Sequence, residues 1–337
     1  MKTNIIAILL CLLLVACSDK QSQLQPNTPV GNFDAFWSVI DQRYCFIEDK
    51  QIDWNQVYAD YRPQIDTLNP KQERELFKAM AECIDLLKDG HVNLYSPFDI
   101  SHSSSWWNGY PANFNSNLLF SDKYLGKNYQ IAGGLYYNRI AQDSIGLIRY
   151  SSFSSGFSAL NMLYVLNYFS SCRGIIIDVR NNGGGDLENA YKLAATFFTK
   201  NQLVGYWQHK TGKGHHDFST LEPLTIDTAD MPCRWFKPVV VLCNRQTYSA
   251  ANFFVNAMRY ADNCVIVGGI TGGGGGMPLS YELPNGWMIR FSAIRMFDAS
   301  KNSIEDGILP DQQITLVSDD KDDLIEYSIA AINSLYK

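Results

Sequence analysis

Apolar residues recur every three or four positions through the first part of the chain, and this spacing predicts three helices. Pro63 and Pro70 punctuate these helical patterns, and Asp89-Gly90 is expected to end the last helix. The stripes comprise Phe33, Phe36, Trp37, Ile40 and Tyr44; Trp54, Val57, Tyr58 and Tyr61; and Leu76, Phe77, Met80, Ile84 and Leu87. We expect residues 32–95 to form a small helical region whose aromatic side chains build its core.

The pattern changes at Ser144, where short apolar runs rich in Ile and Val alternate with helical patterns. Strands are predicted at 145–150, 174–179, 238–243 and 264–267, helices at 157–169, 187–199, 250–261 and 323–336, and a hairpin at 279–295. Alternating strands and helices favour a parallel sheet with flanking helices. The sequence therefore predicts an α/β core over residues 144–337, preceded by a connector of strands and loops at 96–143.

The N-terminus has the pattern of a targeting segment. Lys2 precedes an apolar run at 5–15 that is too short to span a bilayer comfortably, and small residues precede Cys17. This resembles a bacterial lipobox, which implies cleavage before Cys17 and a lipid on its thiol. An ordinary secretory signal is the alternative. We expect a signal at 1–17, a flexible tether at 18–31, and a lipid-anchored protein of the bacterial cell envelope, on the periplasmic face or the cell surface.

Composition excludes several classes of function. The 337 residues are 46% hydrophobic and carry a formal net charge of −6, with lysines and arginines scattered, so nucleic acid is not an expected partner. The cysteines form no Cys-x-x-Cys pair, and the adjacent His215-His216 lie in a polar stretch where they are expected to face solvent. We expect no metal site and no cofactor.

Two junctions between a strand and a helix carry the candidate chemistry. In the first, the β-branched residues Ile175–Ile177 and Val179 lead into Asn181–Gly185, after which a helical pattern begins at Asp186. A strand, a glycine turn and a helix start in this order can direct backbone N–H groups at one anion. In the second, a Val-rich strand leads through a polar turn to Ser249, which would open a helix. Taken alone, Ser249 is better explained as a helix N-cap than as a nucleophile.

Five motifs in a fixed order resemble the tail-specific, or C-terminal processing, serine peptidases and their relatives, which include the tricorn protease core. The motifs are Asp178–Gly185, Thr247–Ala250, Gly268–Gly273, Leu283–Gly286 and Glu305–Asp311. The resemblance covers about residues 144–314 strongly and residues 32–95 more loosely. It implies a ClpP/crotonase-like core and hydrolysis of peptide bonds in peptide or protein substrates through an acyl-enzyme intermediate.

The family divides by the group that accepts the serine proton. One branch uses a lysine in a Gly-Lys-Gly context, but the corresponding stretch here, Gly272–Met277, contains no lysine. The other branch, which resembles the tricorn core, uses a histidine ahead of the core and a glutamate after the serine. His91 and Glu305 match those positions. The resemblance therefore implies a Ser-His-Glu site and not a Ser-Lys dyad.

The resemblance also implies a role for each residue. Ser249 is the nucleophile, His91 the general base that later protonates the leaving amine, and Glu305 the group that orients the relay. The amides of Gly184 and Ala250 receive the oxyanion, although the choice among the three glycines stays open.

This chain departs from the tricorn-like pattern at one position. Where that pattern has a serine beside the histidine, this chain has Gly90. Glu305 would then reach His91 directly, through water, or through a hydroxyl such as Tyr248 or Ser292.

Two further expectations concern substrate selection and a different function. The connector at 96–143 is short for an independent domain, so no PDZ domain is expected between the helical region and the core. The retinoid-binding relatives of this family suggest a non-catalytic ligand- or peptide-binding module as the alternative to an enzyme. The aromatic-rich stretch 96–137, which includes Trp106, Trp107 and Tyr110, is what such a module would use. A third and weaker hypothesis is a crotonase-like activity on acyl esters.

Overall fold

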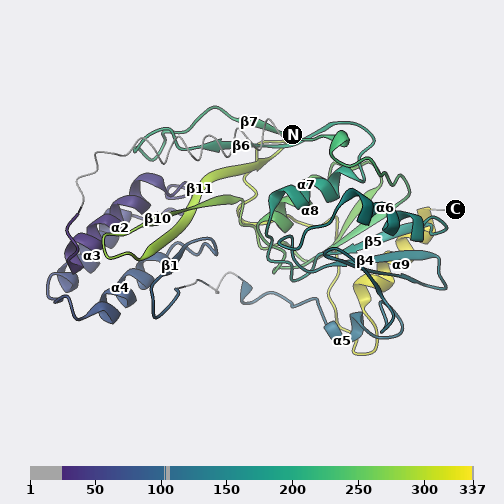
Figure 1. Ribbon diagram of the computed structural model, residues 1–337, viewed down its shortest axis with the longest axis horizontal. Coiled ribbons are helices and arrows are strands. Elements are labelled where there is room, and N and C mark those ends of the chain that lie inside the picture. The colour runs from purple at the N-terminus through teal and green to yellow at the C-terminus, as the bar shows by residue number, and fades with distance from the viewer. Residues whose placement is uncertain (1–24, 102, 104–106, 336–337) are drawn as a thin grey trace. The chain divides into compact units, whose positions relative to one another are not determined.

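The computed structural model describes residues 25–101, 103 and 107–335 (Figure 1). Cys17, the predicted signal at 1–17, most of the predicted tether and Trp106 lie outside these residues. Within them, none of the helices has the length and apolar character needed to cross a membrane. Helix α2 begins at Pro29, capped by the Thr28 side chain, so the last residues of the predicted tether are helical.

The chain divides into two compact units that do not follow simple sequence ranges. The first unit takes residues up to 104 and adds 209–219 and 278–294 from later in the chain. The second unit takes 105–208, 220–277 and 295–337. The sequence predicted continuous regions. It predicted the hairpin at 279–295, but not that this hairpin belongs to the first unit. Each unit is described by itself.

Among the residues that the structure describes, the first unit contains three helices and strands that pair with β11. Its elements are α2 (Pro29–Arg43), α3 (Trp54–Ile65), α4 (Glu73–Asp85), β1 (Asn93–Tyr95) and the parts of β10 (Gly276–Glu282) and β11 (Met288–Asp298) that belong to it. Pro63 lies inside α3, which continues to Ile65. β1 pairs with β11, with Leu94 opposite Ile289.

The core of this unit is the predicted aromatic one. The three stripes predicted from the sequence meet side chains of the β10–β11 hairpin in a single cluster, which includes Phe33, Phe36, Trp54, Phe77, Met80, Leu283, Trp287 and Phe291. Trp37 and Trp54 also exchange hydrogen bonds, each indole N–H donating to the other residue's carbonyl. The aromatic side chains of α2–α4 are therefore core residues, as predicted.

The second unit is built on a seven-stranded sheet in the order β12-β9-β8-β5-β4-β3-β2. β4 (Ile145–Tyr150), β5 (Gly174–Asp178), β8 (Val239–Cys243), β9 (Cys264–Gly268) and β12 (Gln312–Gln313) run parallel, whereas β2 (Gln130–Ala132) and β3 (Leu135–Ile140) are antiparallel. The predicted strands of the core agree with these bounds within a residue or two. The prediction of an α/β core with parallel strands is confirmed.

Helices cover the sheet of the second unit (Figure 1). They are α5 (Ser116–Leu119), α6 (Ala159–Tyr168), α7 (Leu187–Ala195), α8 (Ala250–Met258) and α9 (Asp323–Leu335), with a 3₁₀ turn at Thr228–Asp230. β6 (Gln202–His209) and β7 (Glu222–Ile226) pair antiparallel outside this sheet. α9 packs on one face, where Leu324 and Ile332 meet Ile176 and Val240. Successive side chains of a strand point to opposite faces, so Ile177, next to Ile176 in β5, faces away from α9.

Candidate active site

Ser249 occupies a sharp turn between a strand and a helix. β8 ends at Cys243 and α8 begins at Ala250, and Ser249 between them has φ +57° and ψ −122°. A residue other than glycine rarely adopts such backbone angles, because its Cβ makes the conformation strained. The Ser249 side chain makes no cap hydrogen bond to the helix, so the N-cap explanation does not account for it. A strained turn that exposes a serine at the edge of a sheet is the geometry of a nucleophile elbow.

The helix that follows Ser249 supplies a backbone donor. Ala250 is the first residue of α8, and the first N–H groups of a helix have no acceptor within it. The helix hydrogen bonds begin one turn later, where the Phe253 N–H donates to the Ser249 carbonyl at 2.9 Å. Ala250 N–H therefore lies at a helix N-terminus directly beside the serine.

The glycine turn after β5 packs against this elbow. Gly184 has φ +94°, and a Cβ built on it would lie 2.8 Å from both Ser249 Cβ and Ala250 N. Only glycine fits this close approach without displacing the serine. The Gly184 N–H donates to the Asn182 Oδ1 at 2.9 Å, so it can receive an oxyanion only by exchanging that bond. Gly183 and Gly185, by contrast, are exposed.

A buried charge cluster anchors the start of the glycine turn. Arg180 is fully buried and pairs with Asp178 at 2.7 Å and with Asp322 at 2.8 Å. Burial opposes the ionisation of Asp178, but Arg180 and Arg149 outweigh it and hold its pKa below the usual range. Asp178 also accepts from the Arg180 N–H at 3.0 Å. These contacts give Asp178 a structural role at the end of β5.

The glycine run brings the Glu305 segment close to Ser249. The Ser249 N–H donates to the Gly273 carbonyl at 2.9 Å, and the Gly274 N–H donates to the Glu305 carbonyl at 3.0 Å. Gly273 has φ +81°, and a Cβ there would lie 1.7 Å from the Glu305 carbonyl oxygen. The backbone of the glycine run therefore connects the two segments: Ser249 is hydrogen-bonded to Gly273, and Glu305 is hydrogen-bonded to Gly274. Glu305 is only 7% exposed.

A buried asparagine on α8 strengthens this arrangement. The Asn252 Nδ2 donates to the Ile304 carbonyl at 2.9 Å, and its Oδ1 accepts from the Thr271 hydroxyl at 2.6 Å. Thr271 Oγ1 in turn accepts from the Ile308 N–H at 2.6 Å. Asn252 thus ties the helix that starts beside Ser249 to both flanks of the Glu305 segment.

His91 lies in the first unit, where a buried carboxylate organises its surroundings. The Asp89 Oδ1 accepts from the His91 N–H at 2.8 Å. The Asp89 Oδ2 accepts from the Tyr44 hydroxyl at 3.1 Å and from the Ser292 hydroxyl at 2.9 Å. The His91 Nδ1 lies 4.0 Å from the Asp89 carboxylate. Ser292, one of the hydroxyls considered for the relay, therefore bonds to Asp89.

The environment of His91 keeps its imidazole neutral. The pKa of His91 is lowered to about 4, chiefly by burial; the Asp89 charge opposes this shift, and the nearby Arg290 adds to it. A histidine must be neutral to accept a proton, so this side chain is in the form required of a general base at pH 7.

The structure thus groups the predicted site residues as follows. Ser249, Ala250, Gly184 and the backbone of Glu305 come together in the second unit, and His91 belongs to the first. Sequence analysis missed Asp89, Asn182 and Asn252. From the sequence, Asp89-Gly90 is assigned only to a helix end. A carboxylate two residues before a candidate general base could have indicated that Asp89 orients His91.

His215 differs from its prediction. Instead of facing solvent, its ring lies between two carboxylates, with Nε2 2.9 Å from Asp41 and Nδ1 2.7 Å from Glu48. Its pKa is raised, chiefly by the hydrogen bond to Asp41 against an opposing effect of burial, and Glu48 adds to the rise. Across the described residues, no group of three or more His, Cys, Asp or Glu side chains is arranged to hold a metal ion.

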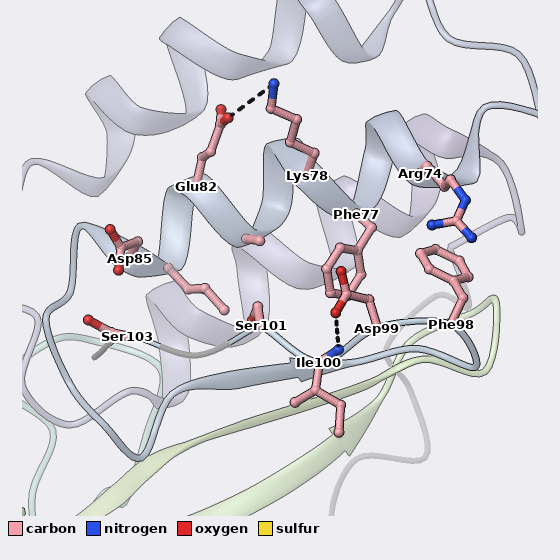
Figure 2. Close-up of a pocket in the computed structure, with 12 residues that line it drawn as sticks. Arg74, Phe77, Lys78, Glu82, Asp85, Phe98, Asp99, Ile100, Ser101 and Ser103 are labelled. Carbon is pink, nitrogen blue, oxygen red and sulfur yellow. Dashed lines mark hydrogen bonds and ion pairs between the residues drawn. The ribbon is translucent and has the colours of Figure 1, made fainter. Parts of the chain in front are cut away.

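The first unit also contains a groove of about 690 Å³ between α4 and the segment after β1 (Figure 2). Phe77 and Phe98 contribute apolar surface, with ring centroids 5.5 Å apart, and Ile100 beside them is 52% exposed. The Arg74 guanidinium lies 4.7 Å from the centre of the Phe98 ring. Lys78 pairs with Glu82, and Asp85 lines the groove further along α4 (Figure 2). The groove is therefore apolar in its floor and mixed in charge at its rim.

Comparison with sequence families finds two matches. Residues 144–314 match peptidase family S41, and residues 26–82 match the tricorn protease C1 domain. The first match covers more than half of the 337 residues. It coincides with the range over which the five motifs resemble the C-terminal processing peptidases.

Curated relatives match the same half of the chain. The carboxy-terminal processing protease CtpA of Bacillus subtilis is 25% identical over 177 residues, which are 52% of this chain and 36% of the relative. A probable CtpA-like serine protease of Staphylococcus saprophyticus is 27% identical over 172 residues, which are 50% of this chain and 33% of the relative. The matched part thus spans about a third of the length of these relatives.

Solved structures match almost the whole chain. A candidate peptidase from Parabacteroides merdae is 42% identical, with a TM-score of 0.85 over 91% of this chain and 97% of its own. Mature CPAF is 14% identical with a TM-score of 0.68, over 92% of this chain and 96% of its own, and that likeness shows the fold alone. Because of the family match and the solved relative of high identity and coverage, we conclude that the chain belongs to peptidase family S41.

Proposed function

We propose that this protein is a serine-type peptidase that cleaves peptide bonds through an acyl-enzyme intermediate, with Ser249 as its nucleophile. The observation that carries the proposal is the strained conformation of Ser249, at the start of α8 and against the bare backbone of Gly184. A folded chain keeps such strain where the surrounding structure requires it, and a nucleophile elbow is such a place. Membership in peptidase family S41 supports the same chemistry.

In this proposal His91 takes the Ser249 proton as the hydroxyl attacks the scissile carbonyl, and it later gives the proton to the leaving amine. A water molecule then hydrolyses the acyl-enzyme, with His91 again acting as the base. The depressed pKa of His91 supports this role, because the imidazole is neutral before the reaction. Glu305 is the proposed orienting group of a Ser-His-Glu site, and the short path from Ser249 through Gly273 and Gly274 to Glu305 supports it.

The negative oxygen that develops on the substrate carbonyl is received by backbone amides. Ala250 N–H is suited to this role because it begins a helix beside the serine. The second donor is an amide of the turn Gly183–Gly185, with Gly184 as the prediction from the sequence. Losing one such donor typically costs about 3 kcal/mol of transition-state stabilisation.

A fluorophosphonate probe tests the nucleophile. The purified protein should be labelled, and Ser249→Ala should abolish labelling. Ser170→Ala serves as the matched control, because Ser170 is an exposed serine after α6 and its variant should label like the wild type. Labelling that survives in Ser249→Ala would refute the nucleophile assignment.

Substrates and location form part of the same proposal. The names of the curated relatives support peptides or proteins as substrates, cleaved near their carboxyl ends. The lipobox-like sequence supports a lipid anchor at Cys17 and a place in the bacterial cell envelope. Palmitate incorporation should be lost in Cys17→Ser, and incorporation that persists would contradict the anchor. Digestion of a peptide library by the wild type and Ser249→Ala would identify the cleavage preference.

A non-catalytic module that binds a ligand or peptide is the second candidate function. The groove beside α4 favours it, since an apolar floor with a charged rim can hold a peptide (Figure 2). A wild-type protein that resists labelling but retains peptides from the library would support this alternative over the peptidase.

A further inference from the structure

The side chain of Asn182 lies inside the second unit, at the base of the glycine turn, and no part of it is exposed to solvent. Its Oδ1 accepts a hydrogen bond from the Gly184 N–H at 2.9 Å. Its Nδ2 donates to the Tyr150 carbonyl at 2.9 Å. Both ends of the carboxamide are therefore satisfied by main-chain groups, as a buried amide requires.

The main chain of Asn182 holds the serine turn as well. The Tyr248 N–H donates to the Asn182 carbonyl at 3.0 Å, and Tyr248 directly precedes Ser249. One residue thus connects the end of β4 at Tyr150, the glycine turn at Gly184 and the nucleophile turn at Tyr248. Ser249 follows Tyr248 directly in the chain.

The contact with Asn182 fixes one side of Gly184, and Phe153 fixes the other. The Gly184 carbonyl accepts from the Phe153 N–H at 2.9 Å. With its N–H held by Asn182, both polar groups of Gly184 are engaged. The Cα of Gly184 meanwhile approaches Ser249 and Ala250 more closely than a Cβ would allow. The position of the turn relative to the serine therefore depends on the Asn182 carboxamide.

We propose that Asn182 is a positioning residue of the reaction, which sets the distance between the amides of the glycine turn and Ser249. This inference rests on the proposed peptidase function. Asn182 does not touch the substrate and acts through Gly184. Its loss should slow the chemical step and leave binding almost unchanged, because a misplacement of about 1 Å at reacting groups can cost on the order of 100-fold in rate.

The rate of fluorophosphonate labelling measures this step without knowledge of the natural substrate. Ser249 Oγ attacks phosphorus, the P–O bond forms as the P–F bond breaks, fluoride leaves, and the hydroxyl proton goes to the base. The phosphoryl oxygen then needs the same amide donors as the oxyanion. While Asn182 holds the Gly184 N–H, these donors are the amides of Ala250 and of Gly183 or Gly185. Asn182→Leu, which removes both side-chain hydrogen bonds at similar volume, should lower the limiting rate constant about 100-fold. The half-saturating probe concentration should change by less than about twofold.

Two further variants control for simple loss of packing. Asn182→Asp keeps an oxygen that can accept from the Gly184 N–H, so its loss of rate should be smaller than that of Asn182→Leu. Asn256→Leu removes a different fully buried carboxamide, on α8, whose Nδ2 donates to the Val204 carbonyl. That variant should label at the wild-type rate.

The outcomes separate the inference from the function on which it rests. Asn182→Leu that labels as fast as the wild type would overturn the inference alone. So would an equal loss of rate in Asn182→Leu and Asn256→Leu, or a change confined to the half-saturating concentration. If Asn182→Leu does not fold, a drop in the limiting rate of Asn182→Asp alone supports the inference, and a wild-type rate overturns it. A wild-type protein that is not labelled overturns both proposals.

Discussion

Ser249 and His91 are positioned by different kinds of contact, backbone contacts in one case and side-chain contacts in the other. Ser249 is held almost entirely by backbone, with a strained φ of its own and glycines at 184 and 273 packed too closely for any Cβ. His91 is positioned by side chains: the Asp89 carboxylate accepts hydrogen bonds from the His91 backbone N–H and from the hydroxyls of Tyr44 and Ser292. A backbone arrangement tolerates no added atom at its close contacts. A side-chain arrangement depends on charge and therefore responds to pH.

This contrast follows from what each residue is proposed to do. An oxyanion needs donors that are fixed before the reaction, and backbone amides held by glycine turns do not have to reorganise. A general base needs a particular protonation state, and burial with a nearby carboxylate adjusts the pKa of an imidazole. Mutations should therefore act by sterics in the first region and through protonation in the second.

The largest effect is expected from Gly184→Ala. The new Cβ would lie 2.8 Å from Ser249 Cβ, Ala250 N and the Tyr248 carbonyl oxygen, and φ +94° disfavours any side chain. Labelling and hydrolysis should fall by at least about 100-fold. Gly183→Ala is the matched control in the same turn, because a Cβ there meets nothing within 4 Å. Equal activity of the two variants would contradict the steric account of this region.

Gly273→Ala should have the next largest effect, through the other contact of Ser249. Its Cβ would fall 1.7 Å from the Glu305 carbonyl oxygen, so the segment that carries Glu305 must move. We expect a loss of activity and a lower free energy of unfolding, by about 1–3 kcal/mol as for other overpacked sites. Urea denaturation measures the second quantity. Gly126→Ala is a control for positive φ without a clash, since its nearest contact is 3.8 Å.

The sequence was sufficient to predict the second unit in some detail. The apolar runs of β4, β5 and β8, and the last three residues of β9, are buried on both faces, and such runs are recognisable without any alignment. The two junctions at Gly183–Gly185 and Ser249 were also predictable, because glycine and small polar residues mark strand-to-helix turns.

The sequence was insufficient where long-range contacts decide the role of a residue. The bond from Asn182 Oδ1 to the Gly184 N–H is local, but the bond from its Nδ2 to Tyr150 depends on β4 lying beside β5. The partners of Asp89 come from α2 and β11, which only the folded first unit brings together. His215 is the same case, since Asp41 and Glu48 precede it by more than 160 residues.

A smaller effect, on the pH dependence of activity, should come from the His91 region. If His91 is the base, kcat/KM should fall on the acid side near pH 4, where His91 gains a proton, and not near pH 6.5. Asp89→Asn should move this limb to still lower pH, because the Asp89 charge raises the pKa of His91. A pH profile of labelling, taken over times too short for acid unfolding, measures both. A limb near pH 6.5 in the wild type would argue against a buried neutral His91.

The smallest effect is expected at His215, where side chains of the first unit again make stability depend on pH. A neutral imidazole has only one N–H, so only the protonated ring can donate to both Asp41 and Glu48. The pKa of His215 is raised in the folded protein, so its stabilisation is complete below the unfolded value of about 6.5 and is lost as pH rises through the folded value. His215→Gln should therefore lower the Tm near pH 6 more than near pH 9. Asp217→Asn, which changes an exposed neighbour, should show no such pH trend, and a His215→Gln effect that grows with pH would reverse the assigned sign.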